Sequence, residues 1–118
     1  MAFLEPGLAQ LQVGGTSAAN GLPLLLYGKS NGATFWIRGT GTVSAGTMLI
    51  EECYYDPAGP VYSGTWSLIA TVDLTTLTGG KQTVYHYPGS FWAVRTRISV
   101  DVTGGGTIDT WAAGWANN

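Results

Sequence analysis

A regular alternation of side-chain types along residues 91–102 is the feature that most restricts how this chain can fold. In an extended chain, successive side chains point to opposite sides. One side of this segment therefore carries Trp92, Val94, Thr96, Ile98, Val100 and Val102, and the other carries Phe91, Ala93, Arg95, Arg97, Ser99 and Asp101. The first set is almost entirely apolar and the second mostly polar. Such a pattern is typical of a β-strand with one face on a hydrophobic core.

Other short segments show the same kind of signal, and glycine or proline turns separate them. No apolar period of 3.6 residues persists for the length of a helix. We predict strands at Leu22–Tyr27, Thr34–Arg38, Thr47–Tyr55, Thr65–Leu74, Gln82–Tyr87, Phe91–Val102 and Thr107–Ala113. Within 65–74, we expect Trp66, Leu68, Ala70, Val72 and Leu74 to point inward. The pattern predicts an all-β fold, a single antiparallel β-sandwich of about seven or eight strands, with either a jelly-roll or an immunoglobulin-like topology.

The first 20 residues differ from the rest, because they are small, polar and rich in glycine, with scattered apolar positions. We expect residues 1–20 to form either an extended arm that packs on another molecule or a first edge strand. Residues 21–118 would then form the sandwich domain. If the segment is an arm, its deletion should leave a folded domain that no longer assembles. The full length of 118 residues suits one domain with its own core.

Charged residues make up only 10% of the chain, against about 25% in an ordinary soluble domain. The net charge of −2 provides no basic field for nucleic acid or an anionic membrane. No apolar run approaches the roughly 18 residues that span a bilayer, and the N-terminus lacks the features of a signal peptide. We therefore expect assembly in the cytoplasm and a surface that neighbouring molecules cover.

The ionisable residues do not predict a catalytic or metal site. Glu51 and Glu52 are adjacent on a predicted strand, so they should face opposite ways, one solvated and one at an edge or interface. Cys53 and His86 are too few for a zinc cage, and a single cysteine forms no internal disulfide. We expect Cys53 to be a packing residue. His86 should make a hydrogen bond at a strand end, or act as a protonation switch in an assembly. The sequence predicts no enzyme, no cofactor and no metal ion.

Aromatic residues are the remaining candidates for function. Trp66 and Trp92 are expected in the core, whereas five tyrosines flank the 56–60 loop and the Pro88-Gly89 turn. Tyrosine is common at protein interfaces and on sugar-binding platforms, and packing beneath loops is a third use. We favour an interface. The candidate interface residues are Phe3, Leu4, Leu8, Leu11, Tyr54, Tyr55, Tyr62, Tyr85, Tyr87, Arg95 and Arg97.

Arg95, Arg97 and Asp101 are expected on the outer face of one strand. The two arginines could pair with an acidic residue of the last strand, such as Asp109, or with a neighbouring subunit. Ordinary solvated cross-strand pairs are the alternative.

Part of the chain resembles a known pattern. This part consists of the segment Phe91–Val102, the turn Gly104-Gly105-Gly106, the following Thr107-Ile108 and, upstream, Gly64-Thr65-Trp66-Ser67-Leu68. Over roughly residues 34–111 the chain is similar to small β-sandwich virion proteins of tailed bacteriophages, particularly capsid cement (decoration) proteins and related tail components. The resemblance implies a jelly-roll-like subunit, often a homotrimer, that sits on the capsid surface and binds the major capsid protein. It carries over no catalytic or binding residue.

Two other classes compete with this one. A glycan-binding or tail-associated module would use tyrosine and tryptophan stacking, and a glycan array would separate it from a cement protein. An enzyme is the third class, but it needs several convergent polar groups, and this chain has few ionisable residues to supply them.

Overall fold

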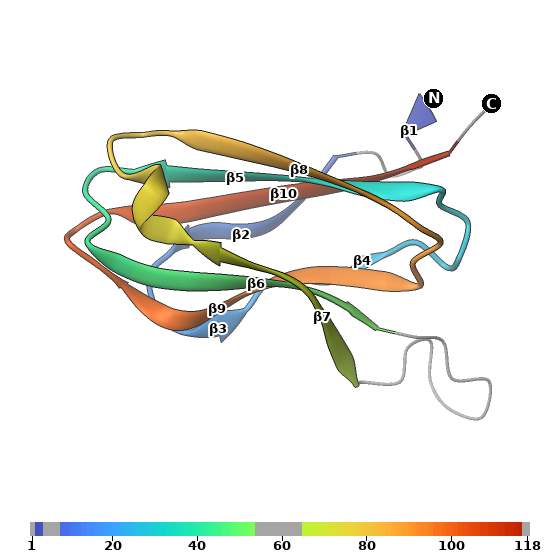
Figure 1. Ribbon diagram of the computed structural model, residues 1–118, viewed down its shortest axis with the longest axis horizontal. Coiled ribbons are helices and arrows are strands. Elements are labelled where there is room, and N and C mark those ends of the chain that lie inside the picture. Colours follow the sequence, from blue (N-terminus) through green and yellow to red (C-terminus); the bar gives the residue numbers. More distant parts are fainter. Residues whose placement is uncertain (1, 4–7, 54–64, 117–118) are drawn as a thin grey trace.

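A computed structural model describes residues 2–3, 8–53 and 65–116, and shows a sandwich of two antiparallel sheets (Figure 1). The all-β class predicted from the sequence is confirmed. The elements are β1 (Ala2–Phe3), β2 (Ala9–Gly15), β3 (Ala19–Asn20), β4 (Leu24–Leu25), β5 (Gly32–Thr40), β6 (Ala45–Cys53), β7 (Trp66–Asp73), the 3-10 helix η1 (Leu74–Leu77), β8 (Gln82–Pro88), β9 (Ala93–Thr103) and β10 (Thr107–Ala116). No helix in these ranges is long and apolar enough to cross a membrane.

The strand order identifies the topology. Sheet A has the order β1-β10-β5-β8, and β2 also pairs with β10. Sheet B has the order β3-β9-β6-β7, and β4 also pairs with β9. If β3 and β4 are taken as one interrupted edge strand, the order β2-β10-β5-β8 faces the order β3/β4-β9-β6-β7. This is the arrangement of an eight-stranded jelly roll. The sequence left a jelly-roll and an immunoglobulin-like topology open, and the structure has the former.

The N-terminal segment runs along the edges of both sheets. β2 pairs with β10 in sheet A and β3 pairs with β9 in sheet B, so residues 9–20 cross from one sheet to the other. Leu11 is buried in the core, and the side chain of Gln12 accepts a hydrogen bond of 3.0 Å from the Thr96 hydroxyl. For these residues the edge-strand alternative is the one observed. Deletion of residues 1–20 is therefore expected to open the core.

Polar groups also cross the interior between the sheets. The hydroxyls of Thr96 on β9 and Thr110 on β10 are 2.8 Å apart and fully buried. Because a hydroxyl has one proton to donate and Thr96 donates it to Gln12, Thr110 must donate to Thr96. This chain of hydrogen bonds joins both sheets to β2. Around it lies the apolar core of Leu11, Leu24, Leu26, Ala33, Phe35, Ile37, Val43, Met48, Ile50, Val72, Leu74, Leu77, Phe91, Val94, Ile98, Val102, Ile108 and Ala112.

Two β-bulges reverse predicted side-chain directions. In the β6–β7 pairing, Ile50 lies opposite Ala70 but Glu51 lies opposite Leu68, so β7 carries one extra residue. In the β6–β9 pairing, Met48 lies opposite Ile98 but the next pair is Thr47 with Val100. An extra residue shifts the alternation to the other face. Leu68 and Val100, both predicted to point inward, are therefore 58% and 51% exposed.

The prediction that Trp66 and Trp92 lie in the core is also wrong. Trp66 is half-buried on the outer face of sheet B, where the Arg95 guanidinium lies 4.1 Å from the centroid of its ring. Trp92 is half-buried just before β9 and meets Tyr27 edge to face, with 5.4 Å between ring centroids. For Trp66, the β7 bulge explains the change of face.

Candidate functional site

Strand alternation places two tryptophans on the outer face of sheet A. Ala33, Phe35 and Ile37 of β5 point into the core, so Trp36 lies on the opposite side. On β10, Ile108, Thr110 and Ala112 are buried between the sheets. Trp111 lies between Thr110 and Ala112 in the chain, so its side chain faces outward. Both tryptophans are half-buried.

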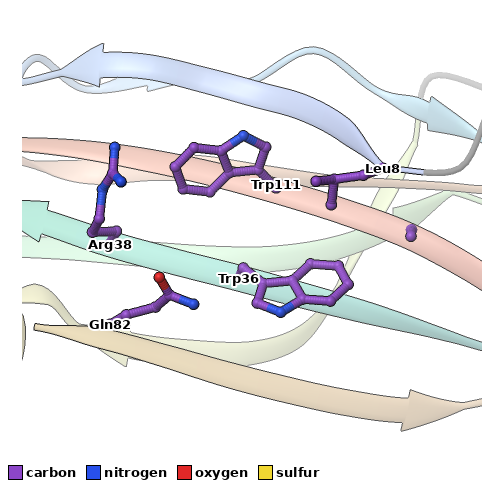
Figure 2. Close-up of a pocket in the computed structure, with 6 residues that line it drawn as sticks. Leu8, Trp36, Arg38, Gln82 and Trp111 are labelled. Atoms are coloured by element: carbon purple, nitrogen blue, oxygen red, sulfur yellow. The ribbon is translucent and has the colours of Figure 1, made fainter.

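Around these tryptophans the surface forms a groove with a volume of about 490 Å³ (Figure 2). Its lining residues are Leu8, Trp36, Arg38, Gln82, Trp111 and Ala113. They come from β5, β8, β10 and the residue before β2. A volume of this size lies within the range of small-molecule binding sites, roughly 300–1,000 Å³.

The tryptophan pair forms the floor of the groove. Trp36 and Trp111 are direct partners in the antiparallel pairing of β5 with β10, a relationship that puts their Cβ atoms about 5 Å apart. Figure 2 shows both indole rings broadside, extending in opposite directions along the strands, Trp111 toward Arg38 and Trp36 away from it. Together the rings give a broad flat apolar surface.

Arg38 is held in place beside this surface. Its Nη2 donates to Asp109 Oδ2 at 3.1 Å, and Asp109 Oδ1 accepts a hydrogen bond of 2.7 Å from the backbone N–H of Gly14. The guanidinium also lies 5.0 Å from the centroid of the Trp111 ring. The side chain remains 45% exposed. Because a guanidinium carries five N–H donors, Arg38 keeps further donors for a ligand.

Two more polar side chains lie on β8, opposite residues of β5. Gln82 is the partner of Arg38 on β8, and its exposed amide makes no hydrogen bond within the described part of the chain. His86 lies further along β8, where its Nδ1 is 2.9 Å from the hydroxyl of Thr34. This contact agrees with the expectation that His86 makes a hydrogen bond.

A separate ionic cluster lies on the outer face of sheet B. Glu51 accepts hydrogen bonds from Arg95 at 3.0 Å and from Arg97 at 3.1 and 3.3 Å. Burial raises the pKa of Glu51, but the hydrogen bonds and charges of the two arginines outweigh it and hold that pKa below its ordinary range. Glu51 is therefore neither solvated nor at a sheet edge, and both of these expectations from the sequence were wrong for it. Neither arginine reaches Asp109, which pairs with Arg38 instead.

The structure places the other predicted interface residues in several settings. Leu8 lines the groove, whereas Leu11 is buried and offers no surface. Tyr85 and Tyr87 are half-buried, stacked 6.2 Å apart and packed against the core. Burial, and then the neighbouring Tyr85, raise the pKa of Tyr87. The backbone of Phe3 pairs with Trp115. Leu4, Tyr54, Tyr55 and Tyr62 lie outside the described residues.

Sequence reasoning missed the groove residues Trp36, Arg38, Gln82 and Trp111. A signal for the first was present, because Trp36 stands between Phe35 and Ile37 and so must point away from them. What the sequence did not provide was the pairing of β5 with β10. Trp36 and Trp111 are 75 residues apart in the chain and meet only in the folded sheet.

The described residues contain no group of three or more His, Cys, Asp or Glu side chains that could hold a metal ion. Cys53, the single cysteine of the chain, is buried, as expected for a packing residue. Most described carboxylates have structural partners. Asp73 accepts from Thr75 N–H at the start of η1, and Asp101 accepts from the N–H of Ala18.

Comparison with known proteins yields neither a matching family model nor a matching curated protein sequence. Among solved structures, the chain is similar to the SPBc2 prophage-derived protein YomS, with a TM-score of 0.52 and 11% identity over 91% of each chain. It is also similar to the Clostridium thermocellum N-terminal endo-1,4-beta-D-xylanase 10B, CBM22-1-GH10 modules complexed with xylohexaose. There the TM-score is 0.50 and the identity 12%, over 98% of this chain and 26% of that one. At these identities the likeness is one of fold.

Proposed function

We propose that this chain is a non-enzymatic structural protein of a phage virion, a capsid cement or decoration protein that acts through protein–protein contacts. Its partners would be further copies of itself, in a homotrimer, and the major capsid protein. The fold likeness to a prophage-derived protein over 91% of both chains supports a phage origin. The site of action would be the capsid surface, after assembly in the host cytoplasm.

The observation that carries the proposal is the exposure of large aliphatic side chains on and just after the N-terminal edge segment. Val13 and Leu22 are 75% and 69% exposed. Single exposed aliphatic side chains are ordinary on protein surfaces. Two within ten residues, on a chain with 10% charged residues, are better explained by a neighbouring molecule that covers them.

A cement protein needs no chemistry, and the described ionic groups suit that role. The carboxylates of Glu51 and Asp109 are committed to arginines, and Asp73 and Asp101 to backbone N–H groups. Such a subunit stabilises a shell by mass action, because it binds the assembled form only. A trimer would strengthen weak contacts through effective concentration.

Light scattering after size exclusion tests the self-association. We expect a trimer for the native chain, and a monomer for the double variant Val13→Ser with Leu22→Ser. Leu68→Ser is the matched control, because it removes an equally exposed aliphatic side chain from the outer face of sheet B.

Co-sedimentation with heads of the phage that encodes the chain tests the second contact. The native chain should pellet with the heads and raise their resistance to heat. A chain that stays monomeric at every concentration and remains in the supernatant would contradict the proposal.

A further inference from the structure

We propose that the groove on sheet A binds a neutral oligosaccharide, with Trp36 and Trp111 as its platform and Arg38 and Gln82 as hydrogen-bonding partners. This inference goes beyond the structural role above and does not depend on it. A virion protein can bind its neighbours through one edge and a sugar through the outer face of a sheet.

The indole pair provides the apolar part of the site. A pyranose ring has one face of C–H groups and a rim of hydroxyls, so it needs a flat apolar surface with polar groups at the border. Trp36 and Trp111 are cross-strand partners whose rings lie broadside in Figure 2. Their opposite directions along the strands extend this surface over more than one sugar ring. Tryptophan also gives a large rigid contact at low entropic cost.

The polar groups stand at one end of the platform. Arg38 is fixed by Asp109 and by the Trp111 ring before any ligand arrives, so little side-chain freedom is lost on binding. Gln82, its neighbour across the β5–β8 pairing, has an amide that both donates and accepts. Sugar hydroxyls do the same, and this pair of side chains matches them.

The charge of the groove favours a neutral ligand. Arg38 is the cation among the lining residues, and its charge is balanced by Asp109 at 3.1 Å. A sulfated or carboxylated sugar would have to compete with Asp109 for the guanidinium. A neutral sugar can use the remaining N–H donors without breaking the ion pair.

The size and lining of the groove suit a small ligand such as a sugar. Its volume of about 490 Å³ lies within the range of small-ligand sites, roughly 300–1,000 Å³. Apart from Leu8, the apolar lining consists of two indoles and one alanine methyl group, with polar groups beside them. A few aromatic side chains with a small number of placed polar groups are typical of sites for small molecules.

Isothermal titration calorimetry with the full chain tests the proposal. The probes are xylohexaose, cellohexaose, mannohexaose and maltohexaose, with a heparin hexasaccharide as the anionic comparison. We expect at least one neutral probe to bind. Trp36→Ala and Trp111→Ala should each weaken binding about tenfold or more, because each removes half of the platform. Arg38→Lys should also weaken it, because lysine lacks the planar fork.

The matched control is Trp66→Ala, which removes a half-buried indole from the outer face of sheet B and should leave sugar binding unchanged. Circular dichroism of each variant shows whether it is folded. If Trp36→Ala fails to fold, Trp36→Tyr provides the same comparison with a smaller ring. Failure of every neutral probe to bind, preference for heparin, or equal loss of binding in Trp66→Ala would overturn the proposal. None of these results bears on the trimer or on capsid binding.

Discussion

The carboxylate of Glu51 binds the guanidinium of Arg97 at two points, Nε to Oε1 at 3.1 Å and Nη2 to Oε2 at 3.3 Å. Arg95 adds a third hydrogen bond to Oε1 at 3.0 Å. The Glu51 side chain is only 7% exposed, so these bonds replace most of its hydration. Glu51 belongs to β6 and both arginines to β9, the two central strands of sheet B. The cluster therefore helps to fix the register of that pair.

Loss of this carboxylate should destabilise the fold. We expect Glu51→Gln to lower the free energy of unfolding by about 2 kcal/mol, because two partly buried guanidinium groups would lose their counter-charge. Urea unfolding followed by circular dichroism measures the change. Glu52→Gln is the matched control, since it removes the same charge from the next residue, for which no ion pair occurs among the described residues. It should change the free energy by less than about 0.5 kcal/mol.

The same cluster predicts how stability depends on acid. The pKa of Glu51 is lowered in the folded chain, so the unfolded chain binds a proton at higher pH than the folded one. The stabilisation is present above the ordinary glutamate pKa of about 4.3 and is lost as the pH falls through the lower folded value. Thermal melts between about pH 6 and pH 3 should show melting temperatures that fall more steeply for the native chain than for Glu51→Gln. Parallel curves would contradict the prediction.

The faces of sheet B show how far sequence reasoning reaches. Alternation correctly placed Val94, Thr96 and Ile98 in the interior, because β9 pairs regularly over that stretch. It failed at Val100 and Leu68, where a single extra residue shifts the alternation. Such a bulge depends on how two strands are paired, and a single strand's sequence does not record that pairing.

The groove in sheet A was inaccessible to sequence reasoning for a related reason. The local pattern around Trp36 already indicated an outward side chain, but its meaning depends on Trp111 lying beside it. That contact arises because the jelly-roll topology inserts β10 between β5 and β2. Strands far apart in sequence become neighbours only through the topology, which the sequence left open.

Gly32 is required by a close contact with Trp115. These residues are partners in the β5–β10 pairing, and a Cβ atom placed on Gly32 would overlap the six-membered ring of the indole. We expect Gly32→Ala to destabilise the fold by about 1–3 kcal/mol, since the ring must move. In a Trp115→Ala background, the same substitution should cost much less. A double-mutant cycle by urea unfolding measures this coupling, and additive effects would exclude the clash as the cause.

Two neighbouring apolar residues of β2 should differ sharply in their contribution to stability. Leu11 is buried in the core at 3% exposure, whereas Val13 is 75% exposed. Leu11→Ala should lower the free energy of unfolding by about 2–3 kcal/mol through the cavity it leaves. Val13→Ala should change it by less than about 0.5 kcal/mol. Equal effects would show that β2 does not pack as described.

Deletion of residues 1–20 extends this argument to the whole edge segment. The deletion removes Leu11 from the core and removes Gln12, which accepts the hydrogen bond of the buried Thr96 hydroxyl. It also leaves unpaired the edge of β10 that β2 covers. A buried donor without a partner alone costs about 1–3 kcal/mol. We therefore expect the truncated chain to show no cooperative thermal transition by circular dichroism. The double variant Val13→Ser with Leu22→Ser, which alters only exposed side chains, should unfold like the native chain. If the truncated chain also unfolded cooperatively, the segment would be a dispensable arm.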